Sequence, residues 1–468
     1  MALTPQAAPF RPERAILGLG DAFYDAVEPA RFPRHVLRFR NRRWDGAVGL
    51  ADLDDAAWIG HFGRFAALEG SLDRPLALRY HGHQFRAYNP DIGDGRGFLF
   101  AQLRDNHGRL LDLGTKGSGQ TPYSRFGDGR LTLKGGVREI LATEMLEALG
   151  VETSKSVSLI ETGEALHRGD EPSPTRSSVL VRLSHGHIRL GTFQRLAYLR
   201  DAESMERLVA YVLTELHGVV PGSDPVRQLL SGVVARSATL AASYMAAGFV
   251  HGVLNSDNIA ITGESFDYGP WRFTPRWEPG FTAAYFDEEG LYAFGRQAQA
   301  IHWDVVQLAI ALRTLVEPET LVAILEDFPA LYETALRDAI FARLGIAPLG
   351  DERDLELLEA LERALTEAET GIAIDRFFFD WAGGRRRGPS PADGLYRQDA
   401  FAAFGMMIGG FPRIRATDHP YWSDSAPCSM HIEEVEAIWA PIAQDDDWSA
   451  FDAKIIAIRR MGEAMRGE

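Results

Sequence analysis

The sequence predicts an α+β protein of two lobes, a β-rich lobe carrying one helix and then a helical lobe, with an extension at each end. Three observations lead to this prediction. Between about residues 76 and 117, short apolar segments alternate with turns containing Gly and Asp, which is typical of β-hairpins. One segment of helical spacing, residues 137–149, follows. After about Arg200, nearly every apolar pattern has helical spacing.

The N-terminal part is divided into an extension and the β-rich lobe. Residues 1–78 read as helical and irregular, with Arg-rich pieces, and we expect them to pack on the rest as an N-terminal extension. The β-rich lobe is predicted over residues 79–200 and is expected to bind a nucleotide. Its predicted strands are 98–103, 110–113, 156–161 and 178–184, and its predicted helix is 137–149.

The C-terminal part is predicted as a helical lobe over residues 201–330 and a helical extension over residues 331–468. The loop 383–391 holds Arg385, Arg386 and Arg387, which we interpret as a solvated charge cluster. A β-rich lobe followed by a helical lobe is the order of parts in a protein kinase. The predicted helices are 205–216, 226–245, 301–316, 321–344 and 355–370.

Composition narrows the class of protein. Hydrophobic residues make up 46% and charged residues 24%, which excludes a disordered or fibrous chain. The net charge of −16 argues against a nucleic-acid binder held by phosphate contacts. We see no signal peptide in residues 1–14 and no apolar stretch long enough for a membrane helix, so we expect a cytoplasmic protein. The single cysteine, Cys428, excludes an intrachain disulfide and a Cys-based zinc site.

A motif-dense stretch begins at residue 251. The kinase catalytic loop reads His-Arg-Asp with an Asn five residues after the Asp. Here His251–Asn258 places Asn258 on the metal-binding Asn, but Val253 occupies the position of the catalytic Asp. An Asp stands instead beside the Asn, at Asp257, and Asp267-Tyr268-Gly269 follows like the kinase Asp-Phe-Gly.

These residue types suit metal and proton chemistry. Magnesium bound to a triphosphate prefers oxygen ligands from one or two side chains, which Asn258 and Asp267 can supply. Asp257 is then the candidate base. The alternative is an ordinary turn rich in Asn and Asp, and the helix before the motif together with Asp-Tyr-Gly after it favours the active site.

A lysine and a glutamate form the second candidate pair. Lys116 follows the predicted strand 110–113 within a Gly-rich segment that is not a Walker A loop. Glu139 lies in the first turn of the predicted helix, and a lysine that reaches phosphates and is held by a helix glutamate is the kinase arrangement. The chain has only four lysines, so a lysine here favours this role over an unrelated surface pair.

Turns and arginines supply further candidates. The tetrapeptide Gly93-Asp94-Gly95-Arg96 recurs as Gly127-Asp128-Gly129-Arg130, and such turns either cradle phosphates or simply close hairpins. Arg182 and Arg189 flank a predicted turn between strands, where they either bind phosphate from one cleft or form surface ion pairs. The pairs His81/His83 and His185/His187 are interpreted as hydrogen-bonded histidines, since they lack further ligands at suitable spacing.

These strings together resemble the selenoprotein O family, whose bacterial branch is called YdiU. The resemblance is specific over about residues 80–315, while the flanking parts match poorly, which suggests a divergent bacterial-type member. The matching strings are Gly82–Phe85, Gly93–Arg96, Lys116–Arg125, Val137–Glu139, Arg189–Phe193, His251–Asn258, Thr262–Pro270, Tyr292–Gln299 and Trp303–Leu312.

The resemblance implies a kinase-like fold that binds ATP in an inverted orientation and transfers AMP to Ser, Thr or Tyr hydroxyls of proteins, releasing pyrophosphate, with Mg²⁺ or Mn²⁺. In that picture Lys116, held by Glu139, contacts phosphate, and Arg182 and Arg189 reach the far phosphates. Asp257 is the base, and Asn258 and Asp267 bind the metal. The implied nucleotide-pocket positions are Gly93, Gly95, Arg96, Asp128 and Gly129.

Two other functions stay open on the sequence. One is a phosphotransferase, acting on proteins or on small molecules as aminoglycoside kinases do, although Val253 fills the usual Asp position. The other is a non-catalytic pseudokinase scaffold, which would have no need of the complete set Lys116, Glu139, Asn258 and Asp267. Uridylyl transfer from UTP is a variant of the protein adenylyltransferase hypothesis. Since Cys428 has no partner in the chain, we do not expect the disulfide control that the resemblance would imply.

Overall fold

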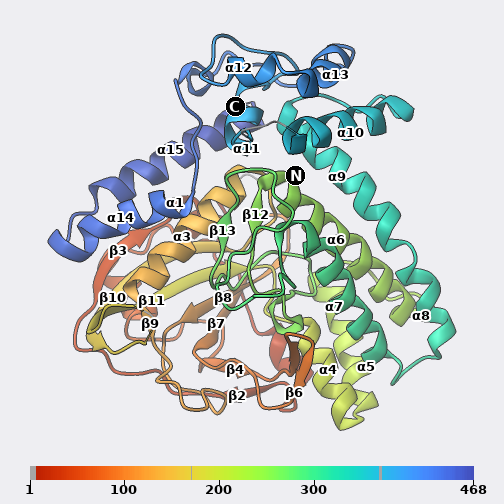
Figure 1. Cartoon of the computed structure of the whole chain (residues 1–468). Coiled ribbons are helices and arrows are strands. Elements are labelled where there is room, and N and C mark those ends of the chain that lie inside the picture. The colour runs from red at the N-terminus through yellow and green to blue at the C-terminus, as the bar shows by residue number, and fades with distance from the viewer. Residues whose placement is uncertain (1–6, 170, 368–370, 468) are drawn as a thin grey trace.

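The computed structural model describes residues 7–169, 171–367 and 371–467, and within them nine strands form one antiparallel sheet (Figure 1). Its order is β2-β4-β7-β8-β11-β10-β3, with β1 beside β7 and β9 beside β11. Two hairpin-like pairs lie outside it, β5 (Gly82–Gln84) with β6 (Ala87–Asn89) and β12 (Phe249–Val250) with β13 (Arg272–Phe273). The strands of the large sheet are β1 (Pro12–Glu13), β2 (Tyr24–Ala26), β3 (Val36–Arg40), β4 (Leu76–Leu78), β7 (Gly97–Arg104), β8 (Leu110–Lys116), β9 (Leu131–Thr132), β10 (Lys155–Leu166) and β11 (Thr175–Ser184).

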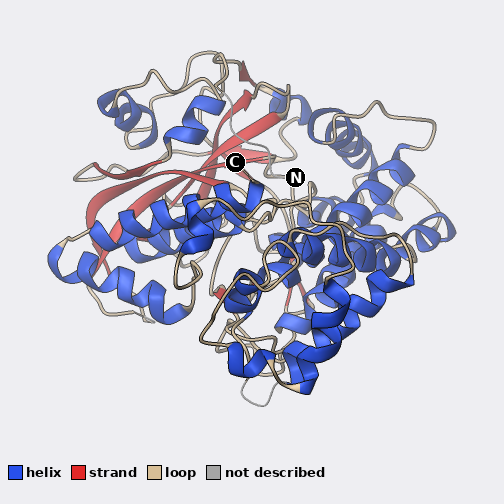
Figure 2. Cartoon of the chain, turned by 90° about the horizontal axis from the view of Figure 1, so that it is seen from above, coloured by secondary structure: helices blue, strands red, loops and turns tan. Residues whose placement is uncertain are grey.

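The sheet is covered on both faces because its strands are apolar on both sides (Figure 2). Successive side chains of a strand point to opposite faces. One set packs with the helix α3 (Leu133–Ala148), and the next set packs with the short helices α1 (Arg42–Ala47) and α2 (Asp55–Phe62). The first set includes Leu99, Leu110, Leu159 and Leu180, and the second includes Phe98, Phe100, Leu111, Val179 and Val181.

The N-terminal segment differs from its prediction. Residues 1–78 were expected to be helical and irregular, but β1 to β4 join the large sheet, and β2 and β3 stand at the two ends of its path. These strands have two to five residues, too few to show an alternating pattern. Arg40 also makes β3 hard to recognise, because a charged residue suggests a solvent-exposed position. Its guanidinium instead lies 4.1 Å from the Trp58 ring centroid and 2.8 Å from the Asp45 carboxylate.

The helical lobe follows the sheet in the order predicted, so the two-lobed, kinase-like α+β arrangement is confirmed. Helix α6 lies at its centre and contacts α7, α8 and α9. The predicted helix 321–344 is two helices, because Pro329 occupies the first turn of the second, a position that Pro favours. The helices are α4 (Leu190–Leu199), α5 (Ala202–Tyr211) with a π-helical turn Val212–Leu216, α6 (Pro225–Ala247), α7 (Gln297–Leu312), α8 (Pro318–Leu325) and α9 (Phe328–Leu344).

The C-terminal extension is helical as predicted and returns to the β-rich lobe, where α14 and α15 lie beside α3 (Figure 1). The predicted helix 355–370 is α10, and residues 368–370 of that prediction lie outside the described residues. Within the described ranges, no helix has both the length and the apolar character to cross a membrane. The helices are α10 (Glu352–Glu367), α11 (Ile374–Asp380), α12 (Asp393–Tyr396), α13 (Asp399–Ile408), α14 (Ile432–Asp445) and α15 (Ser449–Arg466).

The arginine loop after α11 is only partly solvated. Arg385 is exposed, as predicted for the whole cluster. Arg386 and Arg387 are half-buried, with their guanidinium carbons 4.1 Å and 4.0 Å from the ring centroids of Tyr396 and Phe379. The prediction of a solvated cluster is therefore wrong for these two, since an arginine can bury its planar group against aromatic rings.

A buried carboxylate ties both ends of the chain to α3. Glu144 on this helix accepts hydrogen bonds from Asn41 at 2.8 Å and Arg43 at 3.1 Å in the N-terminal segment. It also accepts two from the Arg459 guanidinium of α15, at 2.7 and 2.9 Å. Because α3 also carries Glu139, these contacts hold the helix on which the candidate site depends.

We expect Arg459→Ala to lower the free energy of unfolding by about 2 kcal/mol, because it removes two hydrogen bonds from a buried carboxylate. Urea unfolding followed by circular dichroism measures this change. The matched control is Arg460→Ala, whose ion pair with Asp424 is exposed and should contribute nothing measurable. Equal stability of the two variants would contradict a structural role for the Glu144 cluster.

Candidate active site

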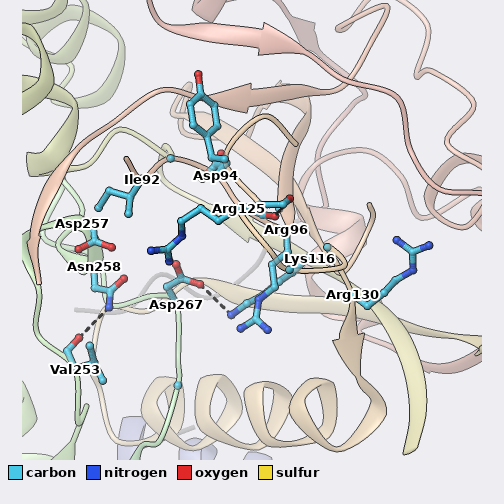
Figure 3. A pocket seen from close by; sticks show the side chains of 18 of the residues that line it. Ile92, Asp94, Arg96, Lys116, Arg125, Arg130, Val253, Asp257, Asn258 and Asp267 are labelled. Atoms are coloured by element: carbon cyan, nitrogen blue, oxygen red, sulfur yellow. Dashed lines mark hydrogen bonds and ion pairs between the residues drawn. The ribbon is translucent and has the colours of Figure 1, made fainter. Parts of the chain in front are cut away.

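A cavity of about 830 Å³ lies between the sheet and the loops of the helical lobe (Figure 3). Of the predicted site residues, only Glu139 does not line it, and it bonds to one that does. The structure therefore brings residues that lie between positions 93 and 267 of the sequence together at one place. The predicted residues along its wall are Gly93, Gly95, Arg96, Lys116, Asp128, Gly129, Arg182, Arg189, Asp257, Asn258 and Asp267.

Lys116 and Glu139 form the predicted pair. Lys116 ends β8, and its ammonium lies 2.6 Å from the Glu139 carboxylate on α3. Both side chains are buried. The sequence predicts Glu139 in the first turn of this helix. The helix begins at Leu133, however, so Glu139 lies in its second turn. A buried lysine held by a helix carboxylate is the arrangement that positions phosphate in kinases.

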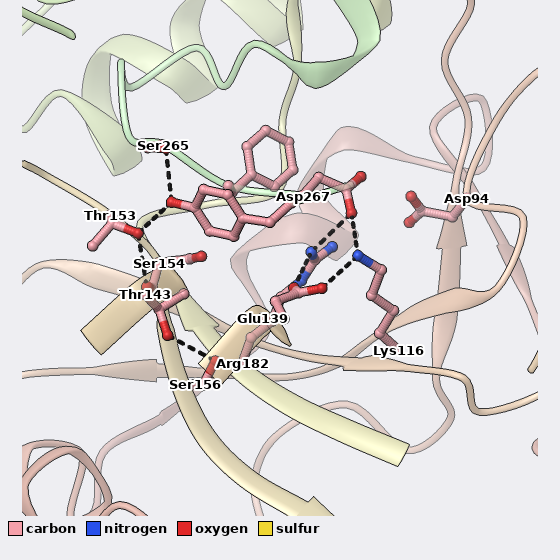
Figure 4. A network of polar contacts seen from close by, with 12 residues as sticks. Asp94, Lys116, Glu139, Thr143, Thr153, Ser154, Ser156, Arg182, Ser265 and Asp267 are labelled. Atoms are coloured by element: carbon pink, nitrogen blue, oxygen red, sulfur yellow. Dashed lines mark hydrogen bonds and ion pairs between the residues drawn. The ribbon is translucent and has the colours of Figure 1, made fainter. Parts of the chain in front are cut away.

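Asp267 stands at the centre of the charged groups (Figure 4). Its carboxylate lies 2.9 Å from Lys116, 3.1 Å from Arg182 and 2.9 Å from Arg189. Burial alone would raise the pKa of this carboxyl, but the three cations outweigh burial and hold the pKa well below its usual range. The carboxylate is therefore ionised at neutral pH and faces a cluster of positive charge.

The residue after Asp267 fixes the loop to both lobes. Tyr268 donates a hydrogen bond to Ser265 at 2.7 Å and shares another with Thr153, which precedes β10 (Figure 4). Tyr244 of α6 bonds to the same Ser265 hydroxyl at 2.6 Å. Asp267 itself has a φ of 65°, an uncommon conformation for a residue with a side chain. The surrounding bonds hold it there.

Arg182 and Arg189 meet at Asp267 from two different elements. Arg182 is on β11, but Arg189 precedes α4, so the predicted turn between two strands is a turn from a strand into a helix. Arg189 also donates to the Asp94 carboxylate at 3.2 Å and to the Asp257 carbonyl at 2.8 Å. The prediction that both arginines face one cleft is confirmed, and the alternative of surface ion pairs is excluded by their burial.

The loop after α6 places Asp257 and Asn258 on the cavity wall (Figure 3). The side-chain amide of Asn258 donates to the Val253 carbonyl at 2.9 Å, which leaves its amide oxygen for another partner. Burial raises the pKa of the Asp257 carboxyl to about 6, with the charge of Asp267 adding to the shift and that of Arg189 opposing it. A carboxyl with this pKa can accept a proton near neutral pH.

The two repeated tetrapeptides lie on the same cavity. Gly93 packs so closely on Tyr123 that a Cβ would come within 2.5 Å of the ring, which explains the glycine. In the second tetrapeptide, Asp128 accepts two hydrogen bonds from Arg168, at 2.9 and 3.0 Å, and Gly129 has a φ of 70°. The turns thus line one site, as the phosphate-cradle hypothesis requires.

Sequence reasoning missed some residues of the wall. Asp94 was seen only as part of a tetrapeptide, although it holds Arg189, and Gln84 and Arg125 appeared only inside longer strings. The buried carboxyl of Asp304 on α7 was also missed. Burial raises the pKa of this carboxyl well above the usual range, and the charge of Asp257 adds to the shift. Its sequence neighbours are apolar at helical spacing, so no pattern marked it.

Three of the four paired histidines form the predicted side-chain hydrogen bonds, whereas His185 bonds to Glu264 through its backbone amide, at 2.9 Å. His81 Nδ1 lies 2.8 Å from the Tyr88 hydroxyl, and His187 Nδ1 lies 3.1 Å from the Asp112 carboxylate. His83 Nδ1 lies 2.9 Å from the Gln194 amide. Among the residues that the structure describes, no group of three or more His, Cys, Asp or Glu is placed to hold a metal ion. A metal at this site would therefore depend on Asn258, Asp267 and the ligand itself.

Comparison with known proteins places the chain in a family. The family model described as protein adenylyltransferase SelO matches residues 8–386. That range extends beyond residues 80–315 at both ends, so the flanking parts are less divergent than the sequence strings suggested. Among solved structures, a kinase domain of a Toxoplasma gondii rhoptry antigen is 13% identical over 57% of this chain and 84% of that chain, with a TM-score of 0.30.

Curated relatives align along most of the chain. A protein of Gloeobacter violaceus is 44% identical over 96% of this chain and 95% of its own length. One of Trichodesmium erythraeum is 47% identical over 77% of each chain, and one of Pseudomonas putida is 36% identical over 80% of this chain and 74% of its own. All three are named protein nucleotidyltransferase YdiU. This chain belongs to the protein adenylyltransferase SelO family.

Proposed function

We propose that this chain is a protein nucleotidyltransferase that moves the AMP of ATP to Ser, Thr or Tyr hydroxyls of proteins and releases pyrophosphate. The observation that supports it most is that one cavity holds both a base and an anion site. Asp257, a carboxyl with a pKa of about 6, lines the same cavity as the cations Lys116, Arg182 and Arg189, which meet at Asp267. A base and an anion site are the two devices that such a transfer requires.

The chemistry follows from these positions. The acceptor hydroxyl gives its proton to the Asp257 carboxylate while its oxygen attacks the α-phosphorus of ATP. The bond between that phosphorus and the bridging oxygen breaks, and pyrophosphate leaves with the electron pair. Lys116, Arg182 and Arg189 stabilise the charge that develops on the leaving group, which corresponds to an inverted nucleotide with its far phosphates deep in the site.

The donor set fits a divalent cation such as Mg²⁺ or Mn²⁺. Asp267 supplies an ionised carboxylate, and Asn258 supplies an amide oxygen that its own hydrogen bond leaves unused. Oxygen ligands of this kind are those that magnesium prefers, with phosphate oxygens and water completing its shell. When bound, the ion would neutralise phosphate charge and polarise the reacting phosphoryl group.

The test is label transfer to acceptor proteins and to the purified protein itself. ATP labelled at the α-phosphate is compared with ATP labelled at the γ-phosphate and with α-labelled UTP, with Mg²⁺ or Mn²⁺. We expect covalent label from α-labelled ATP only. Label from the γ position would indicate a kinase instead, and stronger label from UTP would change the nucleotide assigned to the site.

We expect Lys116→Met to lower kcat/KM for AMP transfer by about 10- to 100-fold, the equivalent of one charge-assisted contact to phosphate. Methionine fills the buried position and Glu139 keeps its contact with Arg182 at 3.5 Å, so the variant should fold, with a lower melting temperature than wild type. Steady-state kinetics with α-labelled ATP give the value. Lys134→Met is the matched control, because Lys134 pairs with Glu436 outside the cavity. Unchanged activity of the first variant would remove Lys116 from the site.

A further inference from the structure

An unusual turn stands beside Asp257. Because Gln84 pairs with Ala87, the hairpin β5–β6 closes through two residues, Phe85 and Arg86, with φ of 49° and 63°. Two positive φ values define a type I′ turn, which strongly favours Asn-Gly. A phenylalanine and an arginine here cost conformational free energy. Strained positions of this kind gather at functional sites, and the proposed chemistry does not employ these two side chains.

The hairpin is fastened to the loop that carries Asp257. The His83 amide donates to the Ser256 hydroxyl at 2.7 Å, and the Phe85 amide donates to the Asn255 side-chain oxygen at 3.1 Å. At Gly82 an added Cβ would come within 2.9 Å of the Asp257 Cβ. The tip of the hairpin thus has a fixed position relative to the candidate base.

A row of aromatic rings continues from this tip into solvent. The Phe85 ring centroid lies 5.2 Å from that of buried Tyr292, which donates to the same Asn255 oxygen at 2.7 Å. On the outer side, Phe85 lies 5.9 Å from Phe286, and Phe286 lies 5.1 Å from Tyr285. The three outer residues are 40%, 46% and 86% exposed in that order. Exposed aromatic rings that touch one another are typical of protein interfaces.

Two acidic side chains stand beside this row, while the Arg86 guanidinium of the turn lies 5.5 Å from the Trp303 ring centroid. Glu288 and Glu289 are exposed and follow Phe286 closely in the chain. In the described part of the chain, neither carboxylate is joined to a basic side chain, and Arg296 bonds to Glu289 only through the backbone carbonyl, at 2.9 Å. The row and these two carboxylates, which we call the aromatic surface, therefore suit a polypeptide segment with an apolar side chain and a nearby Lys or Arg.

We propose that the aromatic surface docks the segment of the protein substrate that carries the acceptor hydroxyl. This inference rests on the proposed function. Because the hairpin tip and Tyr292 both bond to Asn255, two residues before Asp257, a segment seated on the rings places a neighbouring hydroxyl at the base. The surface thereby favours hydroxyls next to apolar and basic residues over the same hydroxyls elsewhere.

The experiment uses an oriented library of short peptides, each with a central Ser, Thr or Tyr, labelled from α-labelled ATP by the full-length protein. We expect selection of apolar or aromatic residues at one flanking position and of Lys or Arg at another. The decisive variant is the double substitution Phe85→Asn with Arg86→Gly, which installs the residues that the turn favours and so preserves the fold. A second variant, Tyr285→Ser with Phe286→Ser, removes the outer rings.

We expect both variants to lower kcat/KM for the selected peptide by about 10-fold or more, with unchanged Kd for ATP. Val220→Ser is the matched control, an exposed apolar residue on a loop outside the cavity. Labelling without flanking preference, or variants as active as wild type, would overturn the docking surface alone. Transfer chiefly to a second copy of this chain would reassign the surface to self-association. No label on any peptide or protein would overturn the proposed function itself.

Discussion

Asp257→Asn is expected to lower kcat for AMP transfer by about 10²- to 10⁴-fold, the usual contribution of a general base. Asparagine has the same shape but cannot accept the hydroxyl proton. The Kd for ATP should stay nearly unchanged, because Asp257 contributes no positive charge to the phosphate site. Stopped-time label transfer gives kcat, and calorimetric titration gives Kd. Asp418→Asn, at an exposed position, is the control for the substitution itself.

The same carboxyl sets the pH dependence. With a pKa of about 6, Asp257 is ionised above pH 6 and only about one tenth ionised at pH 5. The transfer rate of wild type should therefore decrease as the pH falls below 6. Asp257→Asn should show no such decrease.

The free energy of unfolding should depend on pH in the opposite sense to the transfer rate. A folded-state pKa above the unfolded value means that the ionised form costs stability once pH rises through 6. The variant should consequently melt at the same temperature as wild type or higher at pH 7.5. An Asp257→Asn protein that loses ATP binding or unfolds would contradict the role of base.

The order of the fold and most of the site were accessible from the sequence because both depend on local patterns. The strands β7, β8, β10 and β11 are apolar runs, the central helix α6 has helical spacing over most of its length, and the structure contains each of them. The motif around Asp257 and Asn258 is likewise contiguous. Glycines such as Gly93 mark backbone approaches that only glycine allows, so they stand out in the sequence.

The rest depended on contacts between distant residues. The edge strand β3 exists because Val36 to Arg40 pair with β10, more than a hundred positions away, and not because of its own pattern. Asp304 and Asp94 matter through residues that are distant in sequence. The charge of Asp257 helps raise the pKa of Asp304, and Arg189 donates a hydrogen bond to Asp94. The turn at Phe85 was hidden for another reason. Its residues contradict the local preference for Asn-Gly, and such conflicts gather at functional positions.

Asp267→Asn should have the second large effect, and it acts on both activity and stability. Transfer should fall by more than about 10³-fold, because the variant loses both the negative charge of a metal ligand and the charge that positions the cations. Without ligand, the free energy of unfolding should fall by about 3 kcal/mol, since three buried cations lose a shared partner. Because the cations hold the pKa of Asp267 well below 3.8, this difference should persist throughout the range from pH 5 to pH 8.

The cation cluster also predicts how this loss can be repaired. Pyrophosphate without metal should raise the melting temperature of Asp267→Asn more than that of wild type, because it replaces the missing negative charge between Lys116, Arg182 and Arg189. Differential scanning fluorimetry with and without pyrophosphate measures both shifts. Asn258→Ala is the matched control, since it removes the other metal ligand without touching the cations, and it should lose activity while losing only the stability of its one hydrogen bond to the Val253 carbonyl. Equal pyrophosphate shifts in all three proteins would mean that these cations do not form the phosphate site.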